Sequence, residues 1–201
     1  MRLRSIRDVL AEYPAYRVEW GFHGDVESQG HGCISHVVIC TDSGKPLYDK
    51  YMIAENPGVI VVPYDVKSKL IRVGLIMEER VIPGKEFLSV PRGSSEGNEN
   101  LEETALRELL EETGLKAESI ELISYLNPNP AVYRTRTPVM AARITDLGFA
   151  GKASGDGFAE SIMRVKAYTL GELRLLRLEC GITKAALFDF ESFCPVIQSR
   201  I

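Results

Sequence analysis

Residues 91–115 carry the strongest structural signal in this sequence and read PRGSSEGNENLEETALRELLEETGL. Asn100-x-x-Glu103 is a capping-box pattern, in which each side chain accepts a hydrogen bond from the other residue's backbone. Good helix formers follow until Thr113-Gly114, where glycine can adopt the left-handed conformation that ends a helix. The segment therefore predicts a helix over about residues 100–113.

Acidic residues cluster along one side of this predicted helix. Glu108, Glu111 and Glu112 stand at positions i, i+3 and i+4, so their carboxylates share a side. We expect the opposite, apolar side to pack on a sheet. The residues assigned to that apolar side are Leu106, Leu109 and Leu110.

The clustered carboxylates need a positive partner. Two unit charges about 6 Å apart repel by roughly 3 kcal/mol at an effective dielectric near 20. Arg107 points sideways from the three glutamates and is not expected to serve them all. Hard oxygen ligands suit Mg²⁺ or Mn²⁺, and an acidic face solvated by water is the alternative.

The same stretch contains a family signature. Its pattern is Gly93-x5-Glu99-x7-Arg107-Glu108-Leu109-x-Glu111-Glu112-x-Gly114-Leu115. This pattern matches every position of the Nudix box, so the chain resembles the hydrolases of nucleoside diphosphates linked to another moiety. The resemblance implies an α/β fold, the Nudix α/β/α sandwich with a mixed sheet.

The resemblance also implies roles for the matching residues. Glu108, Glu111 and Glu112 would hold divalent metal, Mg²⁺ or alternatively Mn²⁺. Gly93 would make a sharp turn and offer its carbonyl to the metal. Arg107 would orient the carboxylates by pairing with Glu99, although Glu99 has the simpler alternative role of bracing the loop.

The implied reaction is hydrolysis of a pyrophosphate bond, which yields a nucleoside monophosphate and a phosphorylated moiety. Bound metal would neutralise the diphosphate and activate water. The general base is either a box carboxylate or a residue on a later loop. Residues 148–157 contain four glycines and are expected to form such a loop, followed by Glu160 as the candidate base. An exposed loop acid is the alternative reading of Glu160.

The segments around the box resemble the ADP-ribose or nucleotide-sugar branch of the family. Pro130 lies near a proline of the ADP-ribose enzymes, whereas Tyr133 lies near a tyrosine of dinucleoside polyphosphate hydrolases. Tyr133 is a candidate for stacking on a base, and Arg134 and Arg136 for contacting phosphates. A packed tyrosine and solvated arginines are the alternatives.

Strands surround the predicted helix on both sides, without regular alternation of strand and helix. This order favours a mixed sheet flanked by helices. We expect residues 1–57 to form a small β-rich segment that can mediate a homodimer, and residues 58–201 to form the hydrolase domain. The expected strands are 36–40, 48–54, 59–62, 70–77, 87–90, 120–126, 139–144 and 162–168, with a turn at 65–69. Thr169 is expected to cap a helix that ends near Gly181, and Thr183 to open another that runs to about Phe193.

Composition limits the remaining classes of function. The chain has 201 residues, 45% of them hydrophobic, which favours a packed domain. Its formal charge of −4 disfavours nucleic acid as a partner. We expect a cytoplasmic protein, because no apolar run is long enough for a membrane span or a signal peptide. The four cysteines are expected to be reduced, and His31, Cys33 and His36 lack the further ligands that a zinc site needs.

Two other functions compete with hydrolysis of small nucleotides. A Nudix-like module that senses a nucleotide without cleaving it would usually have lost box glutamates, whereas this box is complete. An enzyme that processes RNA ends would be expected to have a basic channel, which the acidic balance disfavours. The sequence therefore favours an enzyme acting on small nucleotides.

Overall fold

The computed structural model describes residues 15–20, 32–40, 46–55, 57–80, 84–133, 135–148 and 165–199. The chain divides into two compact units. The first comprises residues 1–56 with 129–135, and the second comprises 57–128 with 136–201. The division of the sequence at residue 57 into a dimerisation segment and a hydrolase domain stays a prediction.

The first unit contains a three-stranded antiparallel sheet in the order β1-β2-β3. Its strands are β1 (Ala15–Trp20), β2 (Gly32–Cys40) and β3 (Pro46–Glu55). The strands expected at 36–40 and 48–54 fall within β2 and β3, whereas β1 was not expected. The backbone amide of Ile53 donates to the Val132 carbonyl at 2.8 Å, which joins the segment 129–135 to β3.

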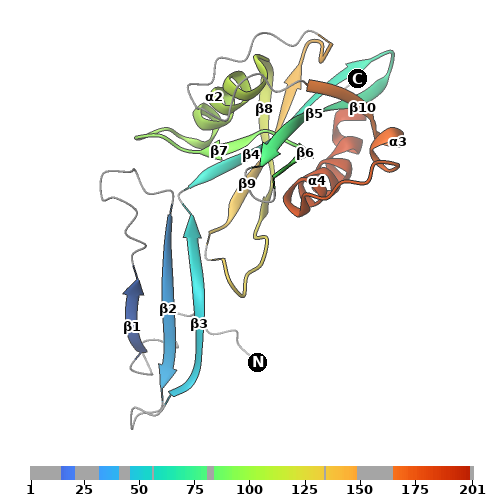
Figure 1. Cartoon of the computed structure of the whole chain (residues 1–201). Helices are drawn as coiled ribbons and strands as arrows, with labels where there is room; N and C mark the ends of the chain where they lie inside the picture. The colour runs from blue at the N-terminus through green and yellow to red at the C-terminus, as the bar shows by residue number, and fades with distance from the viewer. Residues whose placement is uncertain are drawn as a thin grey trace. The chain divides into compact units, whose positions relative to one another are not determined.

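The second unit is built on a seven-stranded mixed sheet (Figure 1). Its central order is β10-β5-β4-β9-β8, with β6 paired to β5 and β7 paired to β4. The β4–β9 pair is parallel and the other pairs are antiparallel. The strands are β4 (Gly58–Lys67), β5 (Leu70–Arg80), β6 (Lys85–Ser89), β7 (Arg92–Ser94), β8 (Ala117–Leu126), β9 (Thr137–Ile144) and β10 (Val165–Thr169).

Helices cover both faces of this sheet, as Figure 1 shows. They are α2 (Leu101–Thr113), α3 (Leu170–Leu173) and α4 (Gly181–Gln198). Successive residues of a strand face opposite sides, so Val59 and Val61 pack with α2 while Ile60 and Val62 pack with α4. The predicted α/β fold, an α/β/α sandwich with a mixed sheet, is confirmed.

The turn expected at 65–69 is shorter than predicted. Strand β4 continues to Lys67, and only Ser68 and Lys69 form the turn, with φ values of 52° and 65°. Asp65 lies in the strand and has no exposed surface. Its burial was unexpected because an Asp near Ser and Lys is typical of a turn.

The C-terminal helices also differ from the prediction. Thr169 and Glu172 form the expected capping box, but α3 ends at Leu173 rather than near Gly181. The segment beyond α3 stays irregular, and its Leu176 and Leu178 pack on the core. Helix α4 begins at Gly181 rather than Thr183, because the buried Thr183 hydroxyl instead accepts a hydrogen bond from the Val90 amide at 3.3 Å. The helix also continues beyond Phe193 to Gln198.

The apolar side of α2 was predicted only in part. Leu109 is fully buried together with Ala105, whereas Leu106 and Leu110 are 43% and 38% exposed. The buried side of the helix instead includes Glu108 and Glu112. None of the helices in the described part of the chain is long and apolar enough to cross a membrane.

Candidate active site

The N-terminus of α2 is organised by local hydrogen bonds. The Asn100 side chain accepts from the backbone amides of Glu102 and Glu103 at 2.9 and 3.0 Å, and the Glu103 carboxylate accepts from the Asn100 amide at 2.9 Å. Gly114 has a φ of 69°, and its amide donates to the Leu110 carbonyl at 2.8 Å. The predicted capping box and helix stop are confirmed.

Two glycines allow β7, β4 and α2 to approach closely. A Cβ atom on Gly93 would lie 1.9 Å from Oε1 of Glu108, a distance that no side chain could occupy. A Cβ atom on Gly58 would lie 2.4 Å from the Gly93 carbonyl oxygen. The box glycine therefore places its backbone directly against the first box carboxylate.

Arg107 is the cation among the carboxylates. Its Nε and Nη2 atoms donate to the two oxygens of Glu99 at 2.9 and 3.1 Å. Its Nη1 donates to Glu108 at 3.0 Å and to Glu111 at 2.8 Å. Nη2 also donates to the Ser94 carbonyl at 2.7 Å. Arg107 therefore bridges Glu108 and Glu111 to Glu99, rather than pointing sideways from the glutamates as the sequence predicted.

These contacts change the acidity of the participating groups. The hydrogen bonds from Arg107 and the Glu96 amide lower the pKa of Glu99 to about 2. The hydrogen bond to Glu99 in turn raises the pKa of Arg107. The pair is therefore fully ionised at neutral pH.

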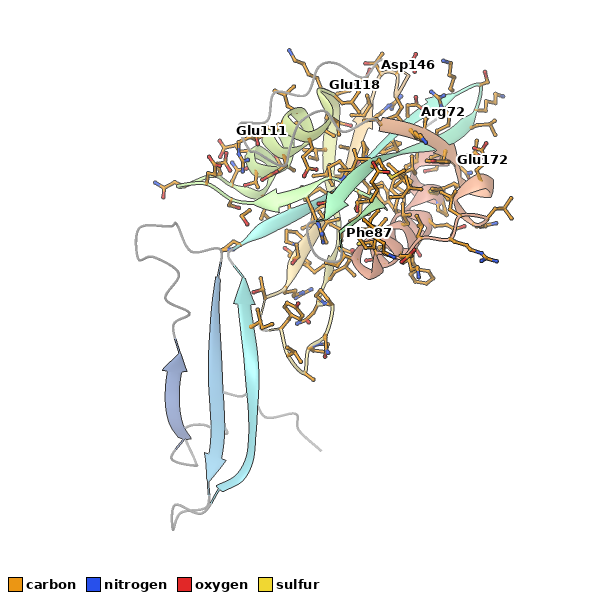
Figure 2. The ribbon with its side chains drawn as sticks, in the orientation of Figure 1. Arg72, Phe87, Glu111, Glu118, Asp146 and Glu172 are labelled. Atoms are coloured by element: carbon orange, nitrogen blue, oxygen red, sulfur yellow. The ribbon has the colours of Figure 1, made fainter. Side chains whose placement is uncertain are left out.

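Glu112 has a different partner from the other two glutamates. Its Oε2 accepts a hydrogen bond from the Arg92 amide at 3.1 Å. Glu112 and Glu108 are only 6% and 8% exposed. Glu111, labelled in Figure 2, projects from α2 with a more exposed side chain. Two of the three negative charges are thus largely removed from water, so a nearby positive charge stabilises them more strongly than it would at the surface.

The donor chemistry of this cluster fits a hard divalent cation. Carboxylate oxygens are the ligands that Mg²⁺ and Mn²⁺ prefer, and the Glu108 carboxylate fills the space beside Gly93 that a side chain there would take. Within the described residues, no three acidic, His or Cys side chains already surround one point. Arg107 engages one oxygen each of Glu108 and Glu111. Each of these carboxylates has a second oxygen, so it can bind a cation while it keeps its hydrogen bond to Arg107.

The sequence model of the NUDIX domain matches residues 54–180. The chain belongs to the NUDIX family. No curated protein sequence matches the chain.

Solved structures share the Nudix fold at low sequence identity. The crystal structure of an ADP compounds hydrolase has a TM-score of 0.65 and 17% identity, and the match covers 93% of this chain and 94% of that one. The NUDIX domain of Shewanella oneidensis NrtR, complexed with ADP ribose, has a TM-score of 0.53 and 17% identity, over 68% of this chain and 86% of that one. At these identities the likeness establishes the fold.

Among the other predicted site residues, Arg136 lies in the same unit as the box residues Gly93, Glu108, Glu111 and Glu112. The Arg136 guanidinium stacks over the Tyr125 ring of β8, with its carbon 4.2 Å from the ring centre. Strands β9 and β4 separate β8 from β7, which carries Gly93. Tyr133 belongs to the first unit, where it forms a bridge with Ile53. Arg134, Glu160 and residues 149–157 of the predicted glycine-rich loop lie outside the described residues.

Two features of the site were missed from the sequence. The first is the Arg92 amide, which binds Glu112 and could be located only once β7 was placed beside α2. The second is Thr104, a fully buried residue whose hydroxyl contacts Glu99 at 3.2 Å. A threonine beside Ala105 on the buried side of an amphipathic helix is a detectable signal, because an apolar residue would normally stand there.

Proposed function

We propose that this Nudix hydrolase cleaves the pyrophosphate bond of a nucleoside diphosphate linked to a second moiety. The products are a nucleoside monophosphate and the phosphorylated moiety. ADP-ribose and nucleotide sugars are the preferred substrate class. The fold likeness to an ADP compounds hydrolase and to a NUDIX domain that binds ADP ribose supports testing ADP-linked substrates first.

The observation that carries this proposal is the contact between Gly93 and Glu108. The box glycine and the box carboxylate meet without room for a Cβ atom, and Glu111 joins the same group through Arg107. A pyrophosphate placed beside this group would otherwise be repelled by the carboxylates. We therefore expect a bound cation to offset the repulsion between these carboxylates and the pyrophosphate.

Mg²⁺, or alternatively Mn²⁺, would be held by Glu108, Glu111, Glu112 and the Gly93 carbonyl. When bound, such an ion supplies positive charge to the diphosphate and lowers the pKa of water at the site. The protein's own contribution is to orient the ligands. Arg107 holds two carboxylates from one side, and the Arg92 amide holds Glu112.

The remaining roles are proposed from the sequence. Glu160 is the candidate general base that removes the proton from the attacking water. Tyr133 is the candidate for stacking on the base, and Arg134 and Arg136 are candidates for contacting phosphates. Residues 1–57 are the candidate homodimer contact.

The test is hydrolysis of a substrate panel with Mg²⁺ and Mn²⁺, with products identified by mass spectrometry. The panel contains ADP-ribose, nucleotide sugars, dinucleoside polyphosphates, nucleoside triphosphates and 5′-triphosphate RNA. We expect ADP-ribose or a nucleotide sugar to be cleaved fastest. Preference for a dinucleoside polyphosphate or for RNA would replace the substrate class, and nucleotide binding without cleavage would identify a sensing module.

Glu112→Gln is the matched active-site variant for this panel. We expect it to lose about 100-fold or more in metal-dependent turnover, because it removes a carboxylate charge from the metal site. Glu102→Gln is the control, since Glu102 is an exposed acid in the first turn of the same helix. Circular dichroism checks that both variants fold. Undiminished turnover by Glu112→Gln would refute the metal assignment.

A further inference from the structure

A buried hydroxyl contacts the acid that anchors Arg107. Thr104 has no exposed surface, and its Oγ1 lies 3.2 Å from Oε2 of Glu99. Oγ1 of Thr104 also lies 3.0 Å from Oγ of Ser95 and 3.0 Å from the Asn100 carbonyl oxygen. Thr104 therefore connects the loop before α2 with the first turn of the helix.

The contacts continue from this hydroxyl to the box carboxylates. Oε2 of Glu99 also accepts from the Glu96 amide at 3.0 Å and from Nη2 of Arg107 at 3.1 Å. Two N–H donors and the Thr104 hydroxyl thus contact the same carboxylate oxygen. Because Glu99 is held in this way, it holds Arg107 in the position that bridges Glu108 and Glu111.

We infer that Thr104 is a positioning residue of the hydrolytic site. It acts through Glu99 and Arg107 on the box carboxylates, and the inference rests on the proposed function for its catalytic consequence. Ser95 supports the same arrangement, because its O–H can donate to the oxygen of Thr104. Thr104 can then direct its own proton to Glu99, the charged and therefore stronger acceptor.

A purely structural role for Thr104 makes a different prediction. A helical threonine can donate to the carbonyl four residues earlier, which here is Asn100 at 3.0 Å. In that case the hydroxyl would affect the stability of α2 but not the position of Arg107. The two roles separate when metal affinity is measured alongside stability.

The experiment compares Thr104→Val, which removes the hydroxyl at nearly constant shape, with Thr104→Ser, which keeps it. Thr113→Val is the matched control. Thr113 is also buried in α2, and its hydroxyl contacts the Leu109 carbonyl and the Leu115 amide rather than Glu99. The measurements are Mn²⁺ affinity by electron paramagnetic resonance, the Arg107 Nε–H signal in ¹⁵N NMR, kcat and the melting temperature.

We expect Thr104→Val to weaken Mn²⁺ binding by about five- to tenfold, which is less than the direct loss of a hydrogen bond to a charged group because the hydroxyl acts through Glu99 and Arg107. Its Arg107 Nε–H signal should shift or broaden, and kcat should fall while KM changes little. Thr104→Ser and Thr113→Val should keep the wild-type Mn²⁺ affinity within about twofold. In a Glu99→Gln background, Thr104→Val should produce no further loss, because both changes interrupt the same series of contacts.

Failure of this inference can be distinguished from failure of the proposed function. Wild-type Mn²⁺ affinity and an unchanged Arg107 signal in Thr104→Val would overturn the positioning role, whatever the turnover. Equal losses of affinity in Thr104→Val and Thr113→Val would also overturn it. If the wild type cleaves none of the panel while the Arg107 signal changes as expected, the positioning role stands and the proposed function fails. Should Thr104→Val not fold, Thr104→Ala removes the same hydroxyl with a residue that favours helix, and the same outcomes decide.

Discussion

Gly93 and Glu99 show how single residues define the site. Position 93 requires glycine because there is no space for a side chain: a Cβ atom there would lie 1.9 Å from a Glu108 oxygen. Glu99 is required for its charge, since Arg107 donates to both of its oxygens. The first requirement is steric and the second is electrostatic, so substitutions at the two positions should have different effects.

Gly93→Ala should displace the Glu108 carboxylate. A shift of about 1 Å in a catalytic ligand can cost roughly 100-fold in rate, so we expect a loss of that order in metal-dependent turnover. Mn²⁺ titration should show weaker binding. The control is Gly97→Ala, because a Cβ atom on Gly97 meets nothing within 4 Å, although its φ of 52° adds some strain. Wild-type turnover in Gly93→Ala would contradict the close contact.

Glu99 should contribute a pH-dependent part of the stability. Hydrogen bonds from Arg107 lower its pKa from an ordinary value of 4.5 to about 2. A group whose pKa is lowered by folding stabilises the protein fully above its unfolded pKa, and this stabilisation is lost as the pH falls through the folded value. Urea unfolding between about pH 4.5 and about pH 2 should therefore show a steeper loss of stability for the wild type than for Glu99→Gln. Parallel profiles would contradict the pairing.

At the scale of elements, α2 and the β4–β5 hairpin each bury charge with a defined partner. Helix α2 buries Glu108 and Glu112 against β7. Arg107 of the same helix donates to Glu108, and the Arg92 amide of β7 donates to Glu112. The hairpin buries Asp65, which accepts from the Arg72 guanidinium and, at 2.9 Å, from the Leu147 amide. This second group joins the hairpin to the segment after β9.

Arg72→Met should destabilise the protein by about 3 kcal/mol, because it leaves the Asp65 charge buried without its cation. Arg72 also contacts Asp146 at 3.3 Å, and both residues are labelled in Figure 2. Lys67→Met is the control. The Lys67–Asp146 pair, at 3.5 Å, is exposed on both sides and should contribute less than about 1 kcal/mol. Equal destabilisation of the two variants in urea unfolding would contradict the importance of burial.

At the scale of the whole molecule, the mixed sheet of the second unit separates the box carboxylates from the larger apolar core. The face that carries α2 presents the box carboxylates, while the face that carries α4 holds a larger apolar cluster that includes Phe190. The central strand β4 contributes to both clusters through alternate residues. Changes in the α4 core should thus affect stability more than metal binding.

The sequence by itself determined the boundaries of α2, the spacing of its acids and the class of fold. Caps and a glycine stop are local hydrogen bonds, so residues a few positions apart are sufficient to specify them. The positions of most strands in the second unit followed because apolar runs and turn residues are also local signals, whereas their order in the sheet came only from the structure.

Only the tertiary structure decided which side of α2 is buried and where Arg107 points. Leu106 and Leu110 are exposed and Glu108 is buried because β7 supplies a glycine and backbone partners from residues far outside the helix. Asp65 and Thr183 likewise looked like local turn and cap residues. Each is instead buried by a partner more than 80 positions away, respectively Leu147 and Val90, and contacts at such separations cannot be read from periodicity.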